Sequence, residues 1–332
     1  RRQRQMCIRD RDDKDQIISV TSAPQSGYST RKMNAGLIRN RGVELSLGGM
    51  PVSTKNWKWE MNFNIAKNSN KLVELADGVD SYSIYWTSFT TRLYNYAMVG
   101  KSLGVITGNT WERDDNGNII FHELSASQKA LYGGEYVPTY NQNTLDELGN
   151  FHPDFTGGFN TSISFKNFRL SANIDFSVGG QIVSYTNMWG SSSGILDKTA
   201  ELNDRGVNVR EPVSKGGGIH MTGVDQDGNK VDTYVNAKLY YTTASRVWEE
   251  WVYDRTYVKL REVSLSYVFP SQTLKKLNIG LSRASVAINA SNPWLIYSAC
   301  PNVDVSEIGM GYFEGGNAAA TRSIGFTVNL AF

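Results

Sequence analysis

The sequence is dominated by stretches in which apolar and polar residues alternate with a period of two. In residues 57–67, WKWEMNFNIAK, every second residue from Trp57 to Ile65 is apolar, and the residues between them are polar. A strand places two such sets on opposite faces, whereas a helix would scatter both around its circumference. Residues 42–48, GVELSLG, alternate in the same way. The pattern therefore predicts strands in both segments.

The clearest β-hairpin is predicted over residues 158–180, GFNTSISFKNFRLSANIDFSVGG. Its arms, 159–165 and 168–178, are joined by Lys166-Asn167, a two-residue connection in which Asn167 suits a positive φ. One face of the second arm is wholly polar, with Arg169, Ser171, Asn173, Asp175 and Ser177. That arm has the length of a tilted transmembrane strand, roughly 9–11 residues.

The remaining strands are predicted between unusually long loops. Strong patterns cover 257–269, 277–290 and 321–332, and weaker ones lie near 92–106 and 233–241. Helical periodicity is almost absent. The segments 109–153, 187–232 and 298–319 are rich in Gly, Ser, Asn and Asp. Short turns that alternate with long loops are typical of outer-membrane barrels. An aromatic girdle is predicted at the strand ends, from Trp57, Trp59, Trp248, Trp251, Tyr253, Tyr257 and Tyr267.

Alternation alone fits two architectures, a soluble sandwich with an apolar core or a membrane barrel with an apolar face toward lipid. The C-terminus favours the barrel. Phe326, Val328, Leu330 and Phe332 share one parity up to the last residue. A closed barrel needs an ordered final strand. The ending also looks like the signal that the bacterial barrel-assembly machinery reads.

Composition excludes several classes of protein. The chain has 332 residues, of which 40% are hydrophobic and 20% charged, and its formal net charge is +2. That charge provides no field that would select nucleic acid. The two cysteines do not make a disulfide scaffold, and no Cys/His spacing resembles a zinc site. No apolar run approaches the length of about 18 residues that a transmembrane helix needs.

The first residues, 1–11, read RRQRQMCIRDR and differ in character from the rest. They resemble translated sequencing-adapter read-through, and a basic loop is the alternative. We exclude them from fold reasoning, as one would an expression scar. Residues 12–35 are then a strand or loop remnant of a barrel, and 36–332 hold C-terminal strands and extracellular loops. On this interpretation the chain is a fragment whose true N-terminus lies elsewhere.

Several blocks resemble the SusC/RagA-type TonB-dependent transporters of Bacteroidetes outer membranes, in the family's order. They are NRGVELSL at 40–47, WKWEMNFNIAKNSNKLVEL at 57–75, VGKSLGVITG at 99–108, HPDFTGGFNTSISFKNFRLSANIDFSVGGQI at 152–182 and VYDRTYVKLREVSLSYVFP at 252–270. The family often carries Asp-Pro-Glu after its Asn-Pro block, and residues 303–307 here read VDVSE instead.

The resemblance implies an all-β fold, the C-terminal part of an antiparallel transmembrane barrel of about 22 strands, with the plug domain absent. It implies a Gram-negative outer membrane and import of oligosaccharides, or of peptides. The expected partners are a SusD-like lipoprotein, the TonB complex acting through the missing N-terminal part, the barrel-assembly machinery and outer-membrane lipid. The loops 109–153 and 187–232 would be extracellular and would contact the lipoprotein or the ligand.

Two sets of side chains are the candidate functional residues on this interpretation. The lumen-facing wall is predicted to comprise Glu44, Lys58, Glu60, Asn62, Arg169, Asn173 and Asp175. Within it, Glu44, Glu60 or Asp175 could pair with Lys58 or Arg169. Trp111, Trp189 and Tyr234 are loop aromatics that could stack on a ligand, with simple packing as the alternative.

No catalytic, cofactor-binding or metal-binding residues are predicted. Residues 190–194, GSSSG, fit Gly-x-Ser-x-Gly but lie in a loop without the following helix that a nucleophile elbow needs. His122, His152 and His220 are too scattered to suggest a general base. The turns 114–118 and 225–229 resemble pieces of calcium loops, so incidental calcium is the one ion considered.

Two alternatives to the transporter remain open. An outer-membrane barrel enzyme, such as a lipase, would need a Ser/His pair on the barrel exterior. A soluble or surface-bound sandwich that binds carbohydrate or acts in adhesion would tolerate deletion of Phe332.

Overall fold

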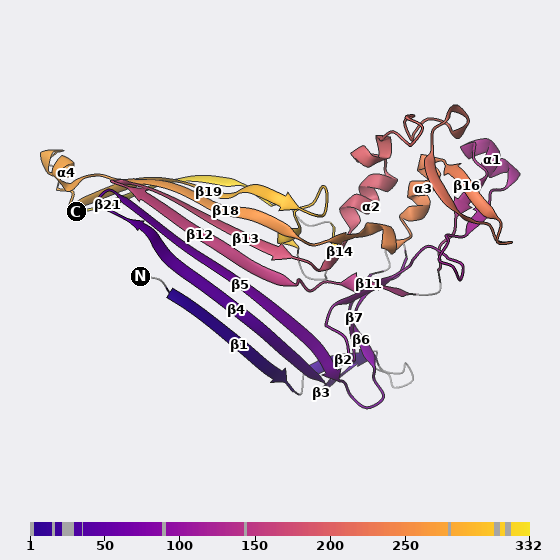
Figure 1. The fold of residues 1–332 in the computed structure, drawn as a ribbon, viewed down its shortest axis with the longest axis horizontal. Coiled ribbons are helices and arrows are strands. Elements are labelled where there is room, and N and C mark those ends of the chain that lie inside the picture. Colours follow the sequence, from indigo (N-terminus) through magenta and orange to yellow (C-terminus); the bar gives the residue numbers. More distant parts are fainter. Residues whose placement is uncertain are drawn as a thin grey trace.

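One curved antiparallel sheet of eight strands organises the structure, a computed structural model (Figure 1). It describes residues 3–14, 17–21, 30–34, 36–87, 91–142, 145–277, 280–308, 313–315 and 320–332. In spatial order the strands are β1 (Gln3–Asp13), β4 (Leu37–Ser53), β5 (Trp57–Glu74), β12 (Phe155–Phe165), β13 (Phe168–Val178), β18 (Tyr257–Val268), β19 (Arg283–Ser298) and β21 (Ser323–Ala331). Among the described residues the sheet does not close, and β1 and β21 form its edges.

The alternation seen in the sequence becomes continuous rows across this sheet. Ile163 of β12 lies opposite Trp59 and Leu170, and the row continues through Leu265 and Ile288 to Phe326 of β21. Directly opposed residues of antiparallel strands project to the same face. This apolar face is largely exposed: Leu170 is 45%, Leu265 47% and Ile288 54% accessible.

The connections at the two ends of the sheet differ greatly in length, as the sequence predicts (Figure 1). One end carries the turns 54–56 and 166–167 and the segment 269–282, which contains helix α4 (Ser271–Leu277). In the tight turn the positive φ belongs to Lys166, at 52°, rather than to Asn167 as expected. The Asn167 side chain instead donates to the Val268 carbonyl at 2.7 Å.

The other end carries the segments 75–154, 179–256 and 299–322, which fold together into what we call the loop module. Its strands are β6 (Ser81–Thr87), β7 (Leu93–Met98), β8 (Val105–Gly108), β9 (Phe121–Glu123), β10 (Tyr136–Pro138), β11 (Asp146–Asn150), β14 (Gln181–Ser184), β15 (Ile219–Val224), β16 (Lys230–Val235), β17 (Val252–Asp254) and β20 (Phe313–Glu314). Its helices are α1 (Ala126–Tyr132), α2 (Tyr185–Ser192) and α3 (Ala237–Ala244), with short 3-10 turns at Asp197–Ala200, Val213–Lys215, Trp248–Trp251 and Val305–Glu307.

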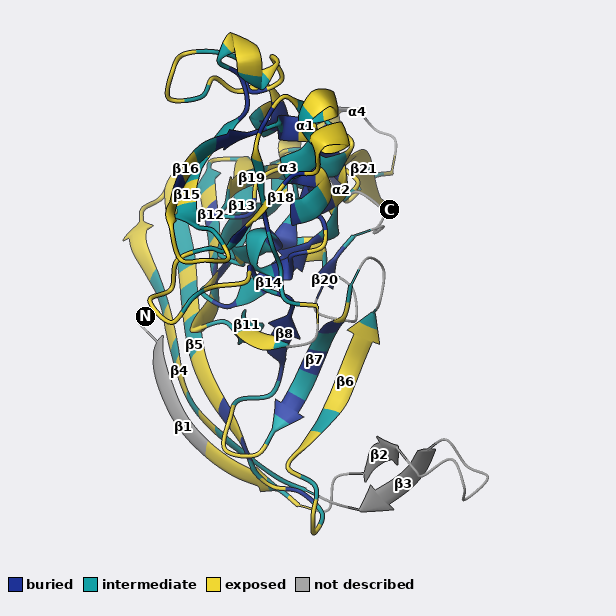
Figure 2. Cartoon of the chain, turned by 90° about the vertical axis from the view of Figure 1, so that its right-hand side faces the viewer, coloured by how far each residue is buried: buried dark blue, intermediate teal, exposed yellow. Residues whose placement is uncertain are grey.

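The largest buried core lies in the loop module and not on the sheet (Figure 2). It draws residues from all three segments, including Ile106, Met188, Trp248, Trp251 and Phe313. The small sheet β17-β14-β20 joins the second and third segments. Burial of large apolar side chains is the main stabilising term in such a module. The loops are therefore a folded unit that stands at one end of the sheet.

Several element predictions are wrong in detail. The weak strand near 233–241 is wrong beyond Val235, because α3 begins at Ala237. The strand placed at 277–290 is shifted, since α4 ends at Leu277 and β19 covers Arg283–Ser298. Helices α2 and α3 have eight residues each and are too short to show a clear period in the sequence.

Of the residues expected to form an aromatic girdle, Trp57 and Tyr267 lie at the short-turn end of the sheet and Tyr257 lies at the loop end. Ring centroids of Trp57 and Phe165 are 4.3 Å apart, and those of Phe168 and Tyr267 are 4.7 Å apart. Trp248 and Trp251 were assigned to the girdle wrongly, because both are buried in the loop module.

The first 35 residues hold three strands in the described parts. Strand β1 pairs with β4, and β2 (Ile17–Thr21) pairs with β3 (Thr30–Asn34). Residues 1–2, 15–16, 22–29 and 35 lie outside the described residues. The adapter interpretation of residues 1–11 and the remnant assigned to 12–35 stay predictions. None of the described helices has the length and apolarity to span a membrane.

Candidate functional site

The face of the sheet opposite the apolar rows is polar across its whole width. Glu60 on β5 faces Ser162 on β12, and the row continues through Ser171 and Ser264 to Asn289 of β19. Ser264 Oγ and Asn289 Oδ1 are 2.6 Å apart, and Asn289 Nδ2 donates to Thr327 Oγ1 at 3.0 Å. Because the strands alternate along most of their length, one side can meet lipid while the other stays hydrated.

The residues expected to line the lumen all lie on this polar face, by strand register. They are Glu44, Lys58, Glu60, Asn62, Arg169, Asn173 and Asp175. Arg169 and Glu60 form the expected kind of pair, with 3.6 Å between Nη2 and Oε2. Of the two other expected acceptors, Asp175 pairs with Arg261 instead, with 2.8 Å between Oδ1 and Nε. Assignment of this face to a lumen stays a prediction.

A β-bulge brings Arg261 onto the polar face. The register between β13 and β18 shifts here, with Asn173 opposite Glu262 and Ile174 opposite Leu260, so that Arg261 is the extra residue. Bulges of this kind redirect a side chain that strict alternation would send to the other face. Arg261 Nε contacts Asp175 Oδ1 at 2.8 Å, and Tyr257 donates to the same carboxylate at 3.2 Å.

Next to the bulge, the buried ammonium group of Lys259 holds the third loop segment against the sheet. The Lys259 side chain is only 2% exposed. Its Nζ lies 2.6 Å from Asp304 Oδ2 and 2.8 Å from Glu307 Oε1, and it donates to Ser306 Oγ at 3.1 Å. Glu307 also pairs with Arg261. A buried charge needs such compensation, and here it comes entirely from one loop.

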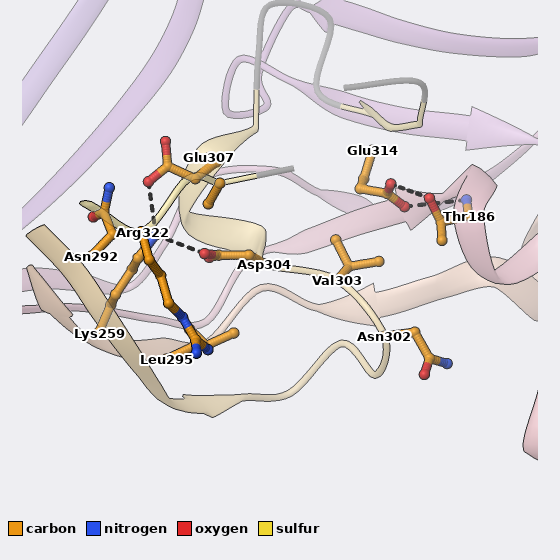
Figure 3. Close-up of a pocket in the computed structure, with 11 residues that line it drawn as sticks. Thr186, Lys259, Asn292, Leu295, Asn302, Val303, Asp304, Glu307, Glu314 and Arg322 are labelled. Carbon is orange, nitrogen blue, oxygen red and sulfur yellow. Dashed lines mark hydrogen bonds and ion pairs between the residues drawn. The ribbon is translucent and has the colours of Figure 1, made fainter. Parts of the chain in front are cut away.

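A pocket of about 410 Å³ opens beside this cluster at the loop end of the sheet (Figure 3). Its lining combines residues of β18 and β19 with residues of the loop module: Thr186, Lys259, Asn292, Leu295, Asn302, Val303, Asp304, Glu307, Glu314, Ala320 and Arg322. Donors and acceptors of both charges converge in it, as they do in sites for polar ligands. Sequence reasoning did not single out this pocket, because its walls come from distant segments.

On the side away from Lys259, Glu314 is buried at the start of helix α2. It is 6% exposed, and its carboxylate accepts hydrogen bonds from Ser184 Oγ at 2.6 Å, from the Thr186 backbone at 3.3 Å and from the Thr186 hydroxyl. Ser184 is the N-cap of α2. Free backbone N–H groups and the dipole at a helix N-terminus stabilise a negative charge. Glu314 thereby ties the third loop segment to the second.

The two loop carboxyls that hold Lys259 have lowered pKa values. Burial of Asp304 opposes its ionisation, but hydrogen bonds from Lys259 and Ser306 outweigh burial and bring the pKa below the ordinary 3.8. The hydrogen bond from Lys259 lowers the pKa of Glu307 below 4.5, against a smaller effect of burial. A lowered pKa stabilises the folded state above the ordinary value, and that stabilisation is lost as the pH falls through the lowered one.

We therefore expect the third loop segment to detach only in acid. In the full-length protein, cleavage by pepsin within residues 299–308 should be slow between about pH 5 and pH 3.8. Cleavage should accelerate below pH 3.8, which is the ordinary pKa of an aspartate such as Asp304. Asp304→Asn is the control, because it removes one titrating group and should flatten the pH dependence. Acceleration at pH values well above 4.5 would contradict this assignment.

The predicted loop aromatics occupy different environments. Trp111 is a correction: it is 2% exposed in the core, and its indole N–H donates to Glu250 at 2.6 Å, so it packs rather than binds. Tyr234 is 9% exposed and lies between the ring of His220 and the guanidinium of Arg205. Trp189 is 43% exposed on α2. The structure does not bring these three rings together.

The acidic turns use their carboxylates internally. Asp114 accepts from the backbones of Asn116 and Asn118 at 2.9 and 2.8 Å, and Asp225 accepts from Asp227 and Asn229 at the same distances. The side-chain amides of Asn118 and Asn229 also donate to these carboxylates, each at 2.9 Å, and they are the largest cause of the lowered pKa values of Asp114 and Asp225. This geometry is that of Asx turns.

The C-terminal residues project from the edge strand. Phe326, Val328, Leu330 and Phe332 are 67%, 50%, 54% and 86% exposed. The first three lie opposite Ile288, Val286 and Ala284 of β19, on the apolar face. Their recognition by an assembly machinery stays a prediction.

Comparisons with known proteins agree with this architecture. TonB-dependent receptor P3 of Formosa agariphila is 27% identical over 287 residues, which cover 84% of this chain and 26% of the receptor. TonB-dependent receptor SusC of Bacteroides thetaiotaomicron is 38% identical over 178 residues, 51% of this chain and 17% of the receptor. The solved RagAB peptide importer in its closed-closed state matches the whole chain with a TM-score of 0.69 at 18% identity, over 34% of its own chain. No family model matches.

A wide antiparallel sheet with one exposed apolar face, one polar face and long loops at a single end defines the wall of a large transmembrane β-barrel. The chain is similar in sequence to TonB-dependent receptors, SusC among them, and in fold to the RagAB importer, so it resembles a fragment of a SusC/RagA-type TonB-dependent transporter. It spans 26% and 31% of the length of two Formosa agariphila relatives, the TonB-dependent receptors P3 and P26.

Proposed function

We propose that this chain forms part of the wall of an outer-membrane importer that takes up oligosaccharides with energy supplied through TonB. The observation that carries the proposal is the two-faced sheet. Its apolar rows are exposed over many strands, which would favour aggregation in water but matches hydrocarbon in a membrane. The polar face then borders the path of a hydrophilic substrate. The names of the curated relatives support a receptor energised through TonB.

The loop module is the proposed contact surface for a SusD-like lipoprotein. All three long segments stand at one end of the sheet, so a cap would meet them together. The module also exposes Leu131, Ile195 and Leu202 at 73%, 77% and 67%. Apolar side chains on a surface of this kind favour contact with a protein partner. Insertion would require the barrel-assembly machinery, acting on the strand that ends at Phe332.

Peptides are the second candidate substrate. The solved RagAB proteins are named as a peptide importer, and their likeness extends over the whole chain. The pocket of Figure 3 offers both charges, which also suits a zwitterionic ligand. Oligosaccharides remain the first proposal because the polar face is rich in Ser, Thr and Asn, which can donate and accept hydrogen bonds with sugar hydroxyls.

The test is uptake by cells that lack the gene containing this chain. Loss of the gene, or of TonB, should abolish uptake of a fluorescent oligosaccharide, and the full-length gene should restore it. Uptake of the free monosaccharide should not change. Loss of peptide uptake with unchanged oligosaccharide uptake would replace the first candidate by the second. Uptake that persists without TonB would contradict both.

A further inference from the structure

A second pocket lies in the loop module, apart from the polar face of the sheet. It measures about 500 Å³ and is bounded by the ends of α1 and α2, the start of α3 and residues near Thr199 and Arg210. Its volume falls within the range of about 300–1,000 Å³ that is usual for small-ligand sites. None of its lining residues belongs to the strands of the eight-stranded sheet.

The pocket is positively charged. Arg210 and Lys238 line it, and no aspartate or glutamate does. The Arg210 guanidinium is fixed in place by Thr199, whose carbonyl accepts from Nε at 2.7 Å and whose hydroxyl lies 2.6 Å from Nη2. It also donates to the Gly194 carbonyl. Within the described ranges no carboxylate forms an ion pair with Arg210, so its charge is available to a ligand.

A buried hydroxyl in the same pocket lacks a partner. Ser191 is 1% exposed and lines the cavity, and its Oγ has no hydrogen-bond partner among the described residues. A buried polar group left without a partner costs free energy, and a ligand that satisfies it recovers that cost. Ser191 belongs to the GSSSG segment at 190–194, and Ser192 and Ser193 line the cavity beside it.

We propose that this pocket binds the carboxylated end of an acidic oligosaccharide, of the uronic acid type. The proposal rests on the proposed function and narrows its substrate class. Arg210 and Lys238 would hold the carboxylate through charge-assisted hydrogen bonds. The serine hydroxyls both donate and accept, as sugar hydroxyls require. Tyr132 and Tyr241 add aromatic rings to the lining, which suit the apolar faces of sugars.

The probe pair is tetragalacturonate and its fully methyl-esterified form, titrated calorimetrically into the full-length receptor. The two compounds share every ring hydroxyl and differ at the carboxyl groups, which the ester converts from charged carboxylates to neutral methyl esters. The acid should bind at least about tenfold more tightly than the ester, because a hydrogen bond to a charged group contributes more than a neutral one. The preference should shrink as the ionic strength rises. Equal affinities, or no binding of either compound, would overturn the proposal.

Variants assign the preference to the pocket. Arg210→Gln and Lys238→Gln should each reduce the ratio of the affinity for the acid to the affinity for the ester. Arg210 holds loop carbonyls in place, so its variant can fail to fold, and Lys238→Gln then serves as the test. Ser191→Ala should weaken binding of both compounds without lowering thermal stability, since the Ser191 hydroxyl has no hydrogen-bond partner among the described residues. Lys230→Gln, an exposed site on β16 outside the pocket, should change nothing. If the ratio of affinities for acid and ester is unchanged in both Arg210→Gln and Lys238→Gln, the acid binds outside this pocket and the proposal fails.

The outcomes separate this inference from the function on which it rests. A receptor that imports neutral oligosaccharides and shows no acid preference refutes the inference alone. Absence of any oligosaccharide uptake, measured in cells, refutes the proposed function independently of the titration. Tighter binding of tetraglutamate than of tetragalacturonate would replace the acidic sugar by an acidic peptide and overturn the proposal.

Discussion

Ile174→Lys should abolish assembly of the full-length receptor in the outer membrane. Ile174 lies near the middle of β13 on the apolar face, opposite Phe159 and Leu260. A lysine at the bilayer midplane costs a barrel about 2–4 kcal/mol, which falls toward zero at the interfaces. Since 1.4 kcal/mol is a factor of ten, the ratio of folded to unfolded receptor should fall by more than about tenfold. The measurement is the amount of heat-modifiable receptor in the outer-membrane fraction.

Asn173→Lys is the matched control for that experiment. Asn173 is the next residue along the same strand, and it lies on the polar face opposite Asn160 and Glu262. The new ammonium group would stay hydrated and meet a carboxylate, so assembly should continue at the level of the unaltered receptor. Equal loss in both variants would point to general damage to the strand. Equal tolerance would contradict the barrel and favour the soluble sandwich.

The sheet could be predicted from the sequence because its signal is local. In β5 and β13 each side chain is assigned a face by its parity, and that assignment needs no knowledge of the neighbouring strands. The polar row through Glu60 and Ser171 follows from alternation once the strands pair. The bulge at Arg261 breaks the parity rule at one residue, and a single sequence gives no sign of it.

The loop module could not be predicted because its contacts are distant in sequence. Trp111 packs with residues more than a hundred positions away and donates to Glu250. Its sequence context is no different from that of the exposed Trp189, so the sequence predicts a ligand-binding role for both equally. Helices α2 and α3 form where capping side chains, Ser184 and Asn236, satisfy their first N–H groups. Packing in the module, rather than intrinsic periodicity, stabilises such short helices.

The cluster around Lys259 also depends on contacts between residues that are distant in sequence. Its disruption is the second prediction with a large expected effect. Lys259 lies on β18 at a polar-face position that the sequence does not distinguish from its neighbours. Its burial depends on the loop that supplies Asp304, which is 45 residues further along the chain. We expect Lys259→Met to release the third loop segment. Removing one partner of a buried ion pair costs about 3–5 kcal/mol, because the remaining charges lose their compensation. The side chains of Asp304 and Glu307 are 21% and 37% exposed, which places the cost near the lower end.

Native-state proteolysis measures this release directly. A cost of about 3 kcal/mol should raise the rate of cleavage within 299–308 roughly a hundredfold, if opening and closing are fast compared with cleavage. Lys129→Met is the control, since Lys129 and its partner Glu123 are 35% and 65% exposed and such pairs contribute at most about 1 kcal/mol. Adding Asp304→Asn and Glu307→Gln to Lys259→Met should restore protection, because the buried charges are then removed together. Continued release in that triple variant would show that the ammonium group holds the loop by packing, and the charge-compensation argument would fail.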